Sequence, residues 1–473
     1  FFNVSYIMVI KKQIIPLFLI ILIYITNVSC VNIQEKNDRP NFIFYLSDDQ
    51  DQLDYSIYGN DLVETSAVSK LAKEGIVFNN FYTSQAICSP SRSQLLTGMY
   101  PVKNGCYANH IPVRSNISSI TKYLKEGGYD VYLAGKSHVK PNSIFDWTHY
   151  FPLKNKRYFQ INKIKDFILN AKNPYCIFIA STFPHAPYVN DEYEDKDILK
   201  LPYENSIPDF KSGYYSNIEI DNNQLTEILT TVDLVNDDNT IFIYASDHGI
   251  SGKWGVYEKG LKTPFVIRWP KKIKPNSKSD ALLSFVDIMP TILDIAEIDI
   301  PKNIDGNSFL QVLNQNNIEI NKYVYGLSTR QNVRDAKVFP SRSIRDNRYK
   351  YILNFNSFEV YKNNFTEYEI VNKFIELGAR SNPNIPYEEL YDLKNDPYEK
   401  NNLAGNENLN SIKIQLSNQL RSWMISQNDF VSDGKTPLIK SSRHQLDKNT
   451  EWTKVPKDLI GKLEDRHYLK SHY

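Results

Sequence analysis

Residues 87–98 read Ile-Cys-Ser-Pro-Ser-Arg-Ser-Gln-Leu-Leu-Thr-Gly, and the expected organisation of the chain follows from this stretch. Ser89 is a residue type that caps helices, Pro90 is tolerated in a first helical turn, and the two leucines fall on one helical face. The stretch therefore predicts a helix with Cys88 at its N-terminus, where the helix dipole and free N–H groups stabilise negative charge. Arg92, one turn further on, would point back to the same place.

The composition limits the classes of function. The chain has 473 residues, enough for two or three domains around a large core. Its 55 Lys and Arg residues against 54 Asp and Glu leave a formal net charge of +1. This balance gives no bulk attraction to nucleic acid or to an anionic membrane, so we expect no nucleic-acid partner and only local anion sites. The 32 tyrosines suit a packed enzyme, and exposed ones would also suit stacking on sugars.

Residues 1–30 have the pattern of an export signal. Lys11 and Lys12 precede an apolar run over 14–25, which is short for a bilayer span. Cys30 makes a lipoprotein signal the alternative to a plain signal peptide. We expect an exported protein with no transmembrane span after processing. Its location would be periplasmic, secreted or lipid-anchored at the cell surface, or lysosomal in a eukaryote.

Two cysteines remain once Cys30 and Cys88 are set aside. Cys176 lies in an apolar run and is interpreted as a core thiol, while a disulfide between it and Cys106 stays open. Four cysteines in a chain of this length do not make a disulfide scaffold.

Two predicted strands, 41–46 and 240–245, end in acidic residues. In α/β sheets the carboxyl ends of strands are where ligands bind, and hard cations such as Ca²⁺ or Mg²⁺ take oxygen ligands. Each strand end alone is also explained by a solvated turn, whereas two of them together favour a joint metal site. The candidate ligands are Asp48, Asp49, Asp247 and, as a less usual partner for a hard cation, His248.

Four further side chains are candidates for acid–base work or anion binding. Lys136 and His138 follow one predicted strand, two residues apart on one side of an extended segment. His185 follows the next strand between two prolines, which stiffen the backbone around it. Lys253 lies close in sequence to the second acidic strand end and would suit an anionic group. Each of these, taken alone, is equally typical of an exposed side chain.

Strands alternate with helices up to about residue 315, which predicts a mostly parallel α/β sheet. Residues 189–215 are polar and irregular, and indicate a long loop. We therefore expect a catalytic domain over 38–320, a smaller α+β domain with an antiparallel sheet over 321–430, and an extension over 431–473. The predicted strands and terminal helix of the smaller domain are 323–327, 341–344, 349–354, 389–393 and 412–425.

With these residues in place, the chain resembles the type I sulfatases of the alkaline phosphatase superfamily, and within them the sulfamidases, or N-sulfoglucosamine sulfohydrolases. The resemblance covers roughly residues 40–430 and implies an alkaline-phosphatase-like fold, a mostly parallel sheet sandwiched by helices. The supporting strings are Cys88–Gly98, Asn104–Tyr107, Gly135–Val139, Pro184-His185, Ser341–Ser343, Glu389–Leu393, Asp396-Pro397, Asn402–Ala404 and Leu420–Trp423.

The resemblance implies that Cys88 is oxidised after translation to formylglycine (3-oxoalanine) by a formylglycine-generating enzyme, and that the aldehyde hydrate is the nucleophile on sulfur. Arg92 would orient this hydrate. The four candidate ligands would bind Ca²⁺, in preference to Mg²⁺.

The remaining roles are implied in the same way. Lys136 and Lys253 would bind sulfate oxygens. His185 would protonate the leaving group, and His138 would assist breakdown of the covalent sulfate ester by taking a proton from the remaining hydroxyl.

Two positions depart from the sulfamidase pattern. His248 stands where sulfamidases have asparagine, and Lys253 stands where they have arginine; other sulfatases share both forms. The substrate therefore stays open between N-sulfate and O-sulfate groups on sulfated sugars, such as heparan-type glycosaminoglycan or algal polysaccharide fragments. A phosphoester or phosphonate hydrolase and a sulfated-glycan-binding protein are the alternatives. The sequence does not determine the oligomeric state, and a homodimer is one of the alternatives.

Overall fold

The computed structural model describes most of the chain between residues 39 and 431. The predicted signal segment 1–30 with Cys30, and most of the predicted extension 431–473, lie outside the described residues. The described residues are 39–172, 174–314, 318–328, 340–355, 386–429, 431, 436–437 and 468–469.

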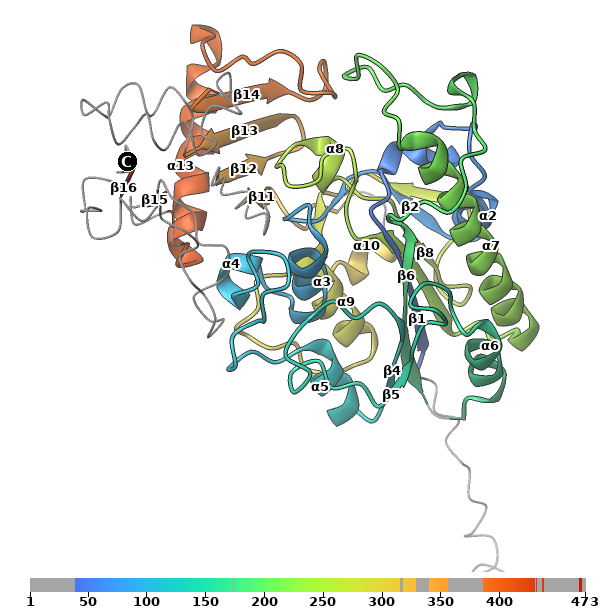
Figure 1. Cartoon of the computed structure of the whole chain (residues 1–473). Helices are drawn as coiled ribbons and strands as arrows, with labels where there is room; N and C mark the ends of the chain where they lie inside the picture. The colour runs from blue at the N-terminus through green and yellow to red at the C-terminus, as the bar shows by residue number, and fades with distance from the viewer. Residues whose placement is uncertain are drawn as a thin grey trace, which may run out of the picture. The chain divides into compact units, whose positions relative to one another are not determined.

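An eight-stranded, mostly parallel sheet with strand order β5-β4-β6-β1-β7-β8-β2-β9 forms the larger part of the fold (Figure 1). Only β8 runs antiparallel to its neighbours β7 and β2. This arrangement confirms the predicted α/β sheet. The strands are β1 (Asn41–Asp48), β2 (Ile76–Phe78), β4 (Asp130–Gly135), β5 (His149–Phe151), β6 (Tyr175–Pro184), β7 (Thr240–Ser246), β8 (Phe265–Arg268) and β9 (Ser277–Ser279).

Helices cover both faces of this sheet, because its central strands are apolar on both sides. In β1, Phe42 and Phe44 pack into one core, and Ile43 and Tyr45 into the other. The first core is covered by α3 (Cys88–Thr97), α5 (Ile120–Glu126), α9 (Ile288–Ile295) and α10 (Leu310–Asn314). The second is covered by α2 (Ser66–Glu74), α6 (Ile161–Asn170) and α7 (Lys211–Val235), seen on the right of Figure 1.

The register of the parallel strands brings their carboxyl ends to one edge. Ser47 of β1 pairs with Ser246 of β7, and Asp48 lies opposite Pro184 of β6. Gly135 of β4 pairs with Ala180 of β6. The residues that follow these strands are therefore neighbours in space, although they are far apart in the sequence.

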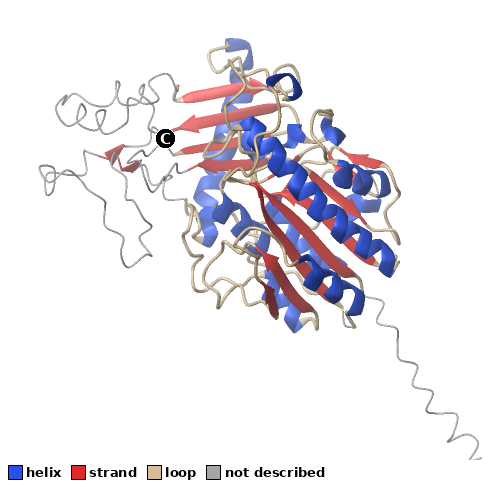
Figure 2. Ribbon diagram, turned by 45° about the vertical axis from the view of Figure 1, so that its right-hand side comes forward, coloured by secondary structure: helices blue, strands red, loops and turns tan. Residues whose placement is uncertain are grey.

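A separate four-stranded antiparallel sheet follows in chain order, and helix α13 (Asn410–Ser426) packs against it (Figure 2). It confirms the predicted antiparallel sheet. Its strands are β11 (Val324–Ser328), β12 (Ser341–Arg345), β13 (Tyr349–Asn354) and β14 (Glu388–Asp392). The remaining short elements are α4 (Pro101–Asn104), α8 (Glu258–Leu261), β3 (Phe81–Tyr82), β10 (Leu283–Ser284), β15 (Thr436–Pro437), β16 (Tyr468–Leu469) and 3-10 turns at 52–54, 56–58, 195–197, 285–287 and 407–409.

A buried ion network joins this second sheet to α8. Glu258 of α8 accepts from Arg345 at 2.9 Å and pairs with Lys350 at 3.2 Å. Lys350 also pairs with Glu399 at 2.9 Å. Burial would raise the pKa of Glu258, but Lys350 and Arg345 outweigh this and hold it at about 2, so its charge is kept at neutral pH.

One apolar run is divided, and one predicted loop is shorter than expected. Residues 76–82 form two strands, because Asn79 and Asn80 interrupt the run and β3 pairs with β10 instead of with the main sheet. Helix α7 begins at Lys211, so the predicted loop over 189–215 ends earlier. The first turns of α7 contain polar residues and a glycine, so the sequence shows no regular spacing of apolar residues there. Tyr214 and Tyr215 in these turns are nevertheless buried.

The structure also bears on the possible disulfide and on a possible membrane-spanning helix. Cys106 and Cys176 are both buried and free, so the disulfide left open by the sequence is not formed. Across the described ranges, the structure contains no helix with the length and apolarity needed to cross a bilayer.

Candidate active site

Helix α3 begins at Cys88, which confirms the predicted cysteine at a helix N-terminus. The expected capping role of Ser89 is wrong: Ile87 is the N-cap residue, and no side chain caps the helix. Ser89 lies inside the first turn, where its N–H donates to Asn109 Oδ1 at 3.2 Å and its Oγ accepts from the His110 N–H at 3.1 Å. The first turn of α3 is thus held against residues 109–110.

The serines and threonine of the same helix fix it in place. The Asn104 amide donates to Ser93 Oγ at 3.0 Å and to Thr97 Oγ1 at 3.2 Å. Ser91 Oγ donates to the Asp247 carbonyl oxygen at 2.6 Å. These bonds explain why small polar residues fill the quoted motif: they position Cys88 relative to the end of β7.

Three carboxylates from the ends of β1 and β7 lie around the start of α3. Asp48, Asp49 and Asp247 are almost fully buried, and the Asp49 N–H donates to Asp247 Oδ1 at 3.0 Å. Arg92 joins the two strand ends, with its Nε 3.0 Å from Asp247 Oδ2 and its Nη2 3.1 Å from Asp48 Oδ1. The structure therefore brings together the acidic residues that the sequence singled out.

Two lysines neutralise this acidic cluster. Lys136 Nζ lies 2.6 Å from Asp48 Oδ2, and Lys253 Nζ lies 2.6 Å from Asp49 Oδ2. Burial would raise the pKa of Asp48, but the charges of Lys136 and Arg92 outweigh it and hold this pKa well below its usual range. Burial would likewise raise the pKa of Asp49, but neighbouring basic groups, Lys253 among them, outweigh it and lower this pKa. Both carboxylates are therefore ionised at neutral pH.

His248 is the last member of the cluster, and the hydrogen bonds of its ring show whether one nitrogen is free to bind a metal ion. Its Nδ1 lies 3.2 Å from the Gly249 carbonyl oxygen, a bond that requires the proton on Nδ1. Its buried Nε2 lies 3.1 Å from Asp49 Oδ1 but has no hydrogen-bond partner in the described part of the chain. A lone pair left free beside three ionisable carboxylates fits a divalent cation.

The geometry of the whole cluster agrees with this fit. Potential ligand atoms of Asp49, Cys88 and His248 lie within 4.8 Å of one another, and so do those of Asp48, Cys88 and Asp247. Burial raises the pKa of the Cys88 thiol, so the neutral thiol is favoured and an unmodified Cys88 is a weak nucleophile.

The two predicted histidines lie on the more open side of the cluster. His185 Nε2 is 3.5 Å from Asp49 Oδ2, and this side chain is 36% exposed. His138 Nε2 lies 2.9 Å from His110 Nδ1, whereas its own Nδ1 is buried with no hydrogen-bond partner among the described residues. Burial, aided by the charge of Lys136, lowers the pKa of His138 to about 2, so the ring is neutral.

Sequence reasoning missed two residues at this site. His110 contacts His138 and the first turn of α3, and its signal was only its place just after the Asn104–Tyr107 string. Arg157 donates to the carbonyl oxygens of His185 at 2.6 Å and Pro187 at 2.8 Å, and thereby holds the segment that carries His185. No motif in the sequence marks Arg157.

Comparison with known proteins decides the family. The model of the sulfatase family matches residues 40–298, and the model of the C-terminal region of N-sulphoglucosamine sulphohydrolase matches residues 246–378. The chain belongs to the sulfatase family. It is therefore an enzyme that hydrolyses sulfate esters or sulfamates, as the resemblance implied.

Individual relatives of this sulfatase agree with the family assignment. An ulvan-active sulfatase from Formosa agariphila is 49% identical over 450 residues, which cover 92% of this chain and 90% of the relative. Human N-sulphoglucosamine sulphohydrolase is 24% identical, and the match covers 83% of this chain and 91% of the human protein.

Solved structures show the same fold. A structure in complex with the substrate D-glucosamine-2-N,6-O-disulfate has a TM-score of 0.66 at 22% identity, and covers 83% of this sulfatase and 98% of that chain. The phosphonate monoester hydrolase of Agrobacterium radiobacter has the same TM-score at 17% identity, and covers 82% and 96% of the two chains. The fold alone therefore does not separate sulfate from phosphonate substrates.

Proposed function

We propose that this sulfatase removes O-sulfate groups from an ulvan-type sulfated polysaccharide or its fragments, using a formylglycine formed from Cys88. The observation that carries the mechanism is the convergence of Arg92, Lys136, Lys253 and His185 around Cys88 at the start of α3. The substrate class is supported by the 49% identity with an ulvan-active sulfatase over nine-tenths of both chains.

The cationic side chains suit a transferring sulfuryl group. Lys136 and Lys253 are each only partly exposed, 17% and 19%, so their charges act in a site of low dielectric constant. In the proposed complex, sulfate oxygens contact these two ammonium groups. Preorganised charge of this kind stabilises the transition state without rearrangement of the protein.

The first half of the proposed reaction transfers the sulfuryl group to residue 88. One hydroxyl of the aldehyde hydrate loses its proton to water as its oxygen forms a bond to sulfur, and the bond between sulfur and the sugar oxygen breaks. His185 lies beside Asp49 and is more exposed than Lys253 and His248, which also contact Asp49. It donates a proton to the leaving oxygen. Arg92 holds the start of α3 against both acidic strand ends, which keeps the hydrate in place.

The second half releases sulfate. His138 takes the proton from the hydroxyl that remains on residue 88, the aldehyde re-forms, and the bond between carbon and the sulfate oxygen breaks. The buried Nδ1 of His138 has no hydrogen-bond partner among the described residues, so it is free to accept this proton. Water then restores the hydrate, and the covalent intermediate has split one displacement into two easier steps.

Asp48, Asp49, Asp247 and His248 would hold the divalent cation, for which we propose Ca²⁺ because carboxylate oxygens predominate. When bound, such a cation polarises a sulfate oxygen and offsets its negative charge. We also propose that the chain is exported and matured by a formylglycine-generating enzyme, from the patterns at residues 1–30 and 87–98.

Removal of N-sulfate from glucosamine is the second candidate. The match to the N-sulphoglucosamine sulphohydrolase C-terminal model over residues 246–378 favours it. Lys253, at a position where sulfamidases carry arginine, favours the O-sulfate alternative.

The test is release of inorganic sulfate by protein that has been co-expressed with a formylglycine-generating enzyme, with conversion of Cys88 checked by peptide mass. The substrates are size-defined ulvan oligosaccharides, N-sulfoglucosamine, glucosamine 6-O-sulfate and an aryl phosphate. We expect release from the ulvan oligosaccharides. Release from N-sulfoglucosamine alone, or faster hydrolysis of the aryl phosphate, would overturn the proposal.

A further inference from the structure

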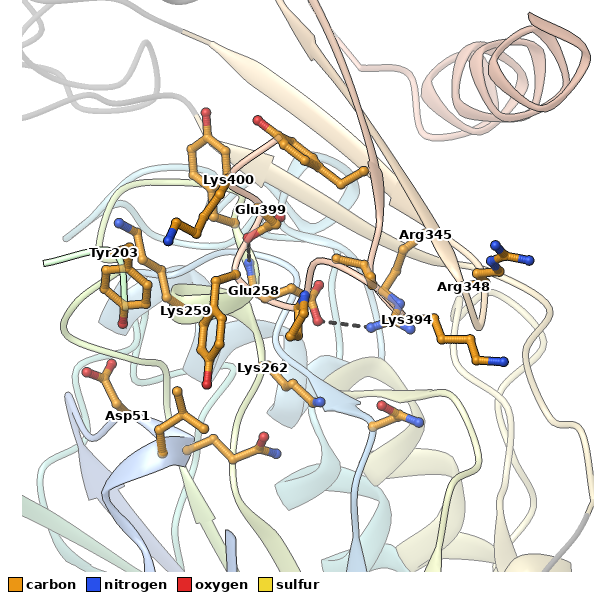
Figure 3. Close-up of a pocket in the computed structure, with 18 of the residues that line it drawn as sticks. Asp51, Tyr203, Glu258, Lys259, Lys262, Arg345, Arg348, Lys394, Glu399 and Lys400 are labelled. Carbon is orange, nitrogen blue, oxygen red and sulfur yellow. Dashed lines mark hydrogen bonds and ion pairs between the residues drawn. The ribbon is translucent and has the colours of Figure 1, made fainter. Parts of the chain in front are cut away.

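A cavity of about 770 Å³ lies outside the catalytic cluster. Its walls come from the end of β1, the loop before α7, α8 and the second sheet, as Figure 3 shows. None of the ten residues assigned to catalysis or metal binding lines it. Its volume is typical of sites that hold a ligand of several rings, which occupy about 300–1,000 Å³.

The cavity has an excess of positive charge. Its three acidic residues are already engaged: Glu258 pairs with Arg345, Glu399 pairs with Lys350, and Asp51 accepts a hydrogen bond from the Ser251 N–H at 3.0 Å. Among the described residues, the ammonium groups of Lys262, Lys394 and Lys400 form no ion pair or hydrogen bond. Lysines that surround one hollow without counterions attract an anionic ligand.

One of these lysines is enclosed at the base of α8. Lys262 is partly buried, and burial lowers its pKa because the charged form loses hydration. The charges of Glu258 and Asp280 offset this only in part, and a bound anion would add further counter-charge. Lys394 and Lys400 are exposed and lie at the rim, on the segment that follows β14.

Aromatic rings accompany the lysines. Lys259 Nζ lies 4.5 Å from the centre of the Tyr203 ring, and the Tyr203 and Tyr398 rings are 6.2 Å apart. Both tyrosines line the cavity. Flat rings with a hydroxyl at one end suit the mixed apolar and polar faces of a sugar, so the lining combines contacts for a sugar ring with contacts for an acidic group.

The cavity and the catalytic cluster share one segment of chain. Residues 247–253 supply Asp247, His248 and Lys253 to the cluster, and α8 with Lys262 follows within ten residues. The segment folds back tightly, since a Cβ on Gly252 would lie 2.2 Å from the Gly260 nitrogen. A ligand in the cavity is therefore held beside the catalytic centre without entering it.

We propose that this cavity is a second saccharide site, which binds a stretch of sugar chain that carries sulfate or carboxylate groups. The choice of a saccharide as ligand rests on the proposed function. The site would hold a polymer near the catalytic centre and raise the local concentration of sulfate groups there.

The experiment is calorimetric titration of the full-length Cys88→Ala protein, which binds without turnover. The probes are a size-defined ulvan oligosaccharide, a heparin-derived tetrasaccharide and inorganic sulfate. We expect Lys394→Glu/Lys400→Glu to weaken saccharide binding roughly tenfold, because contacts of exposed, hydrated lysines each contribute only modestly to affinity. The matched control, Lys274→Glu/Lys302→Glu, changes the same charge at two exposed lysines outside the cavity and should keep the affinity.

Tyr398→Ala tests the same site without altering charge, and should weaken binding on the order of fivefold. Unchanged affinity in both cavity variants would overturn the proposal. So would inorganic sulfate that binds as tightly as the saccharides, because the cavity would then be only an anion site. Binding does not require hydrolysis, so a protein that releases no sulfate but shows the expected losses would overturn the proposed function and leave the second site standing.

Discussion

Replacing Arg92 with lysine keeps the charge but removes the bridge between two strand ends. The guanidinium is 2% exposed and reaches Asp247 at 3.0 Å, Asp48 at 3.1 Å and the Lys136 carbonyl oxygen at 3.1 Å. An ammonium group is a point charge with a different reach, so it cannot span both carboxylates.

The magnitude follows from the bonds that are lost. Loss of both hydrogen bonds to the carboxylates, each about 1.5–3 kcal/mol, lowers the free energy of unfolding by about 3–6 kcal/mol, close to the about 3–5 kcal/mol typical of broken buried ion pairs. If a comparable amount of transition-state stabilisation is lost, kcat/KM falls by roughly a hundredfold or more. Urea unfolding followed by fluorescence, and sulfate release from a chromogenic aryl sulfate, measure the two effects.

Arg114→Lys is the matched control, because Arg114 is exposed and its guanidinium, among the described residues, donates only to the Val102 carbonyl oxygen, at 3.4 Å. We expect it to change the free energy of unfolding by no more than about 0.5 kcal/mol. An Arg92→Lys protein within about 1 kcal/mol of the parent would refute the argument that this bridge holds the two strand ends together.

Three further outcomes are expected. Cys88→Ala should abolish sulfate release, whereas Cys176→Ala, in the core, should keep it; activity in the first variant, measured by ion chromatography, would exclude the formylglycine mechanism. Chelation should remove activity and lower the thermal midpoint, because the clustered carboxylates lose a counter-charge; full activity in protein shown to be metal-free would contradict the metal assignment. Burial raises the pKa of Asp221 to about 7, so the folded state retains a proton that the unfolded state loses near pH 4, and stability falls as pH rises from about 4 to 7. Asp221→Asn should therefore have a higher thermal midpoint than the parent at pH 8 but not at pH 4. An equal difference in thermal midpoint at both pH values would refute the role of the Asp221 proton.

The acidic strand ends show what the sequence could predict. The apolar runs before Asp48 and Asp247 are long enough to mark central strands, and parallel strands in one sheet bring their carboxyl ends together. The candidate metal ligands follow directly from this geometry, and Lys136 and Lys253 follow the ends of β4 and β7 in the same sheet. The helix after Cys88 was equally predictable from its proline and apolar spacing, although its cap was not.

Other features depend on contacts that no local pattern encodes. His110 meets His138 across 28 positions of sequence, and Arg157 acts through carbonyl oxygens, which every residue type presents. The start of α7 was missed because Tyr214 and Tyr215 are buried by segments distant in sequence, including Val63 and Ile198. The cavity proposed as a second saccharide site is lined by six separate segments of the chain, so it could be recognised only once the two sheets were placed.

The buried network around Glu258 has a consequence for protein engineering. Arg345 and Lys350 belong to the second sheet, yet their main counterion is a residue of α8, about ninety positions earlier. A chimaera that exchanges only the C-terminal sheet between two sulfatases would bury these two cations without that partner, at a cost of several kcal/mol. Segments for recombination in this fold should therefore be cut so that α8 stays with β12 and β13, even though β8, β9, α9 and α10, which lie between them in the chain, belong to the larger sheet and its helices.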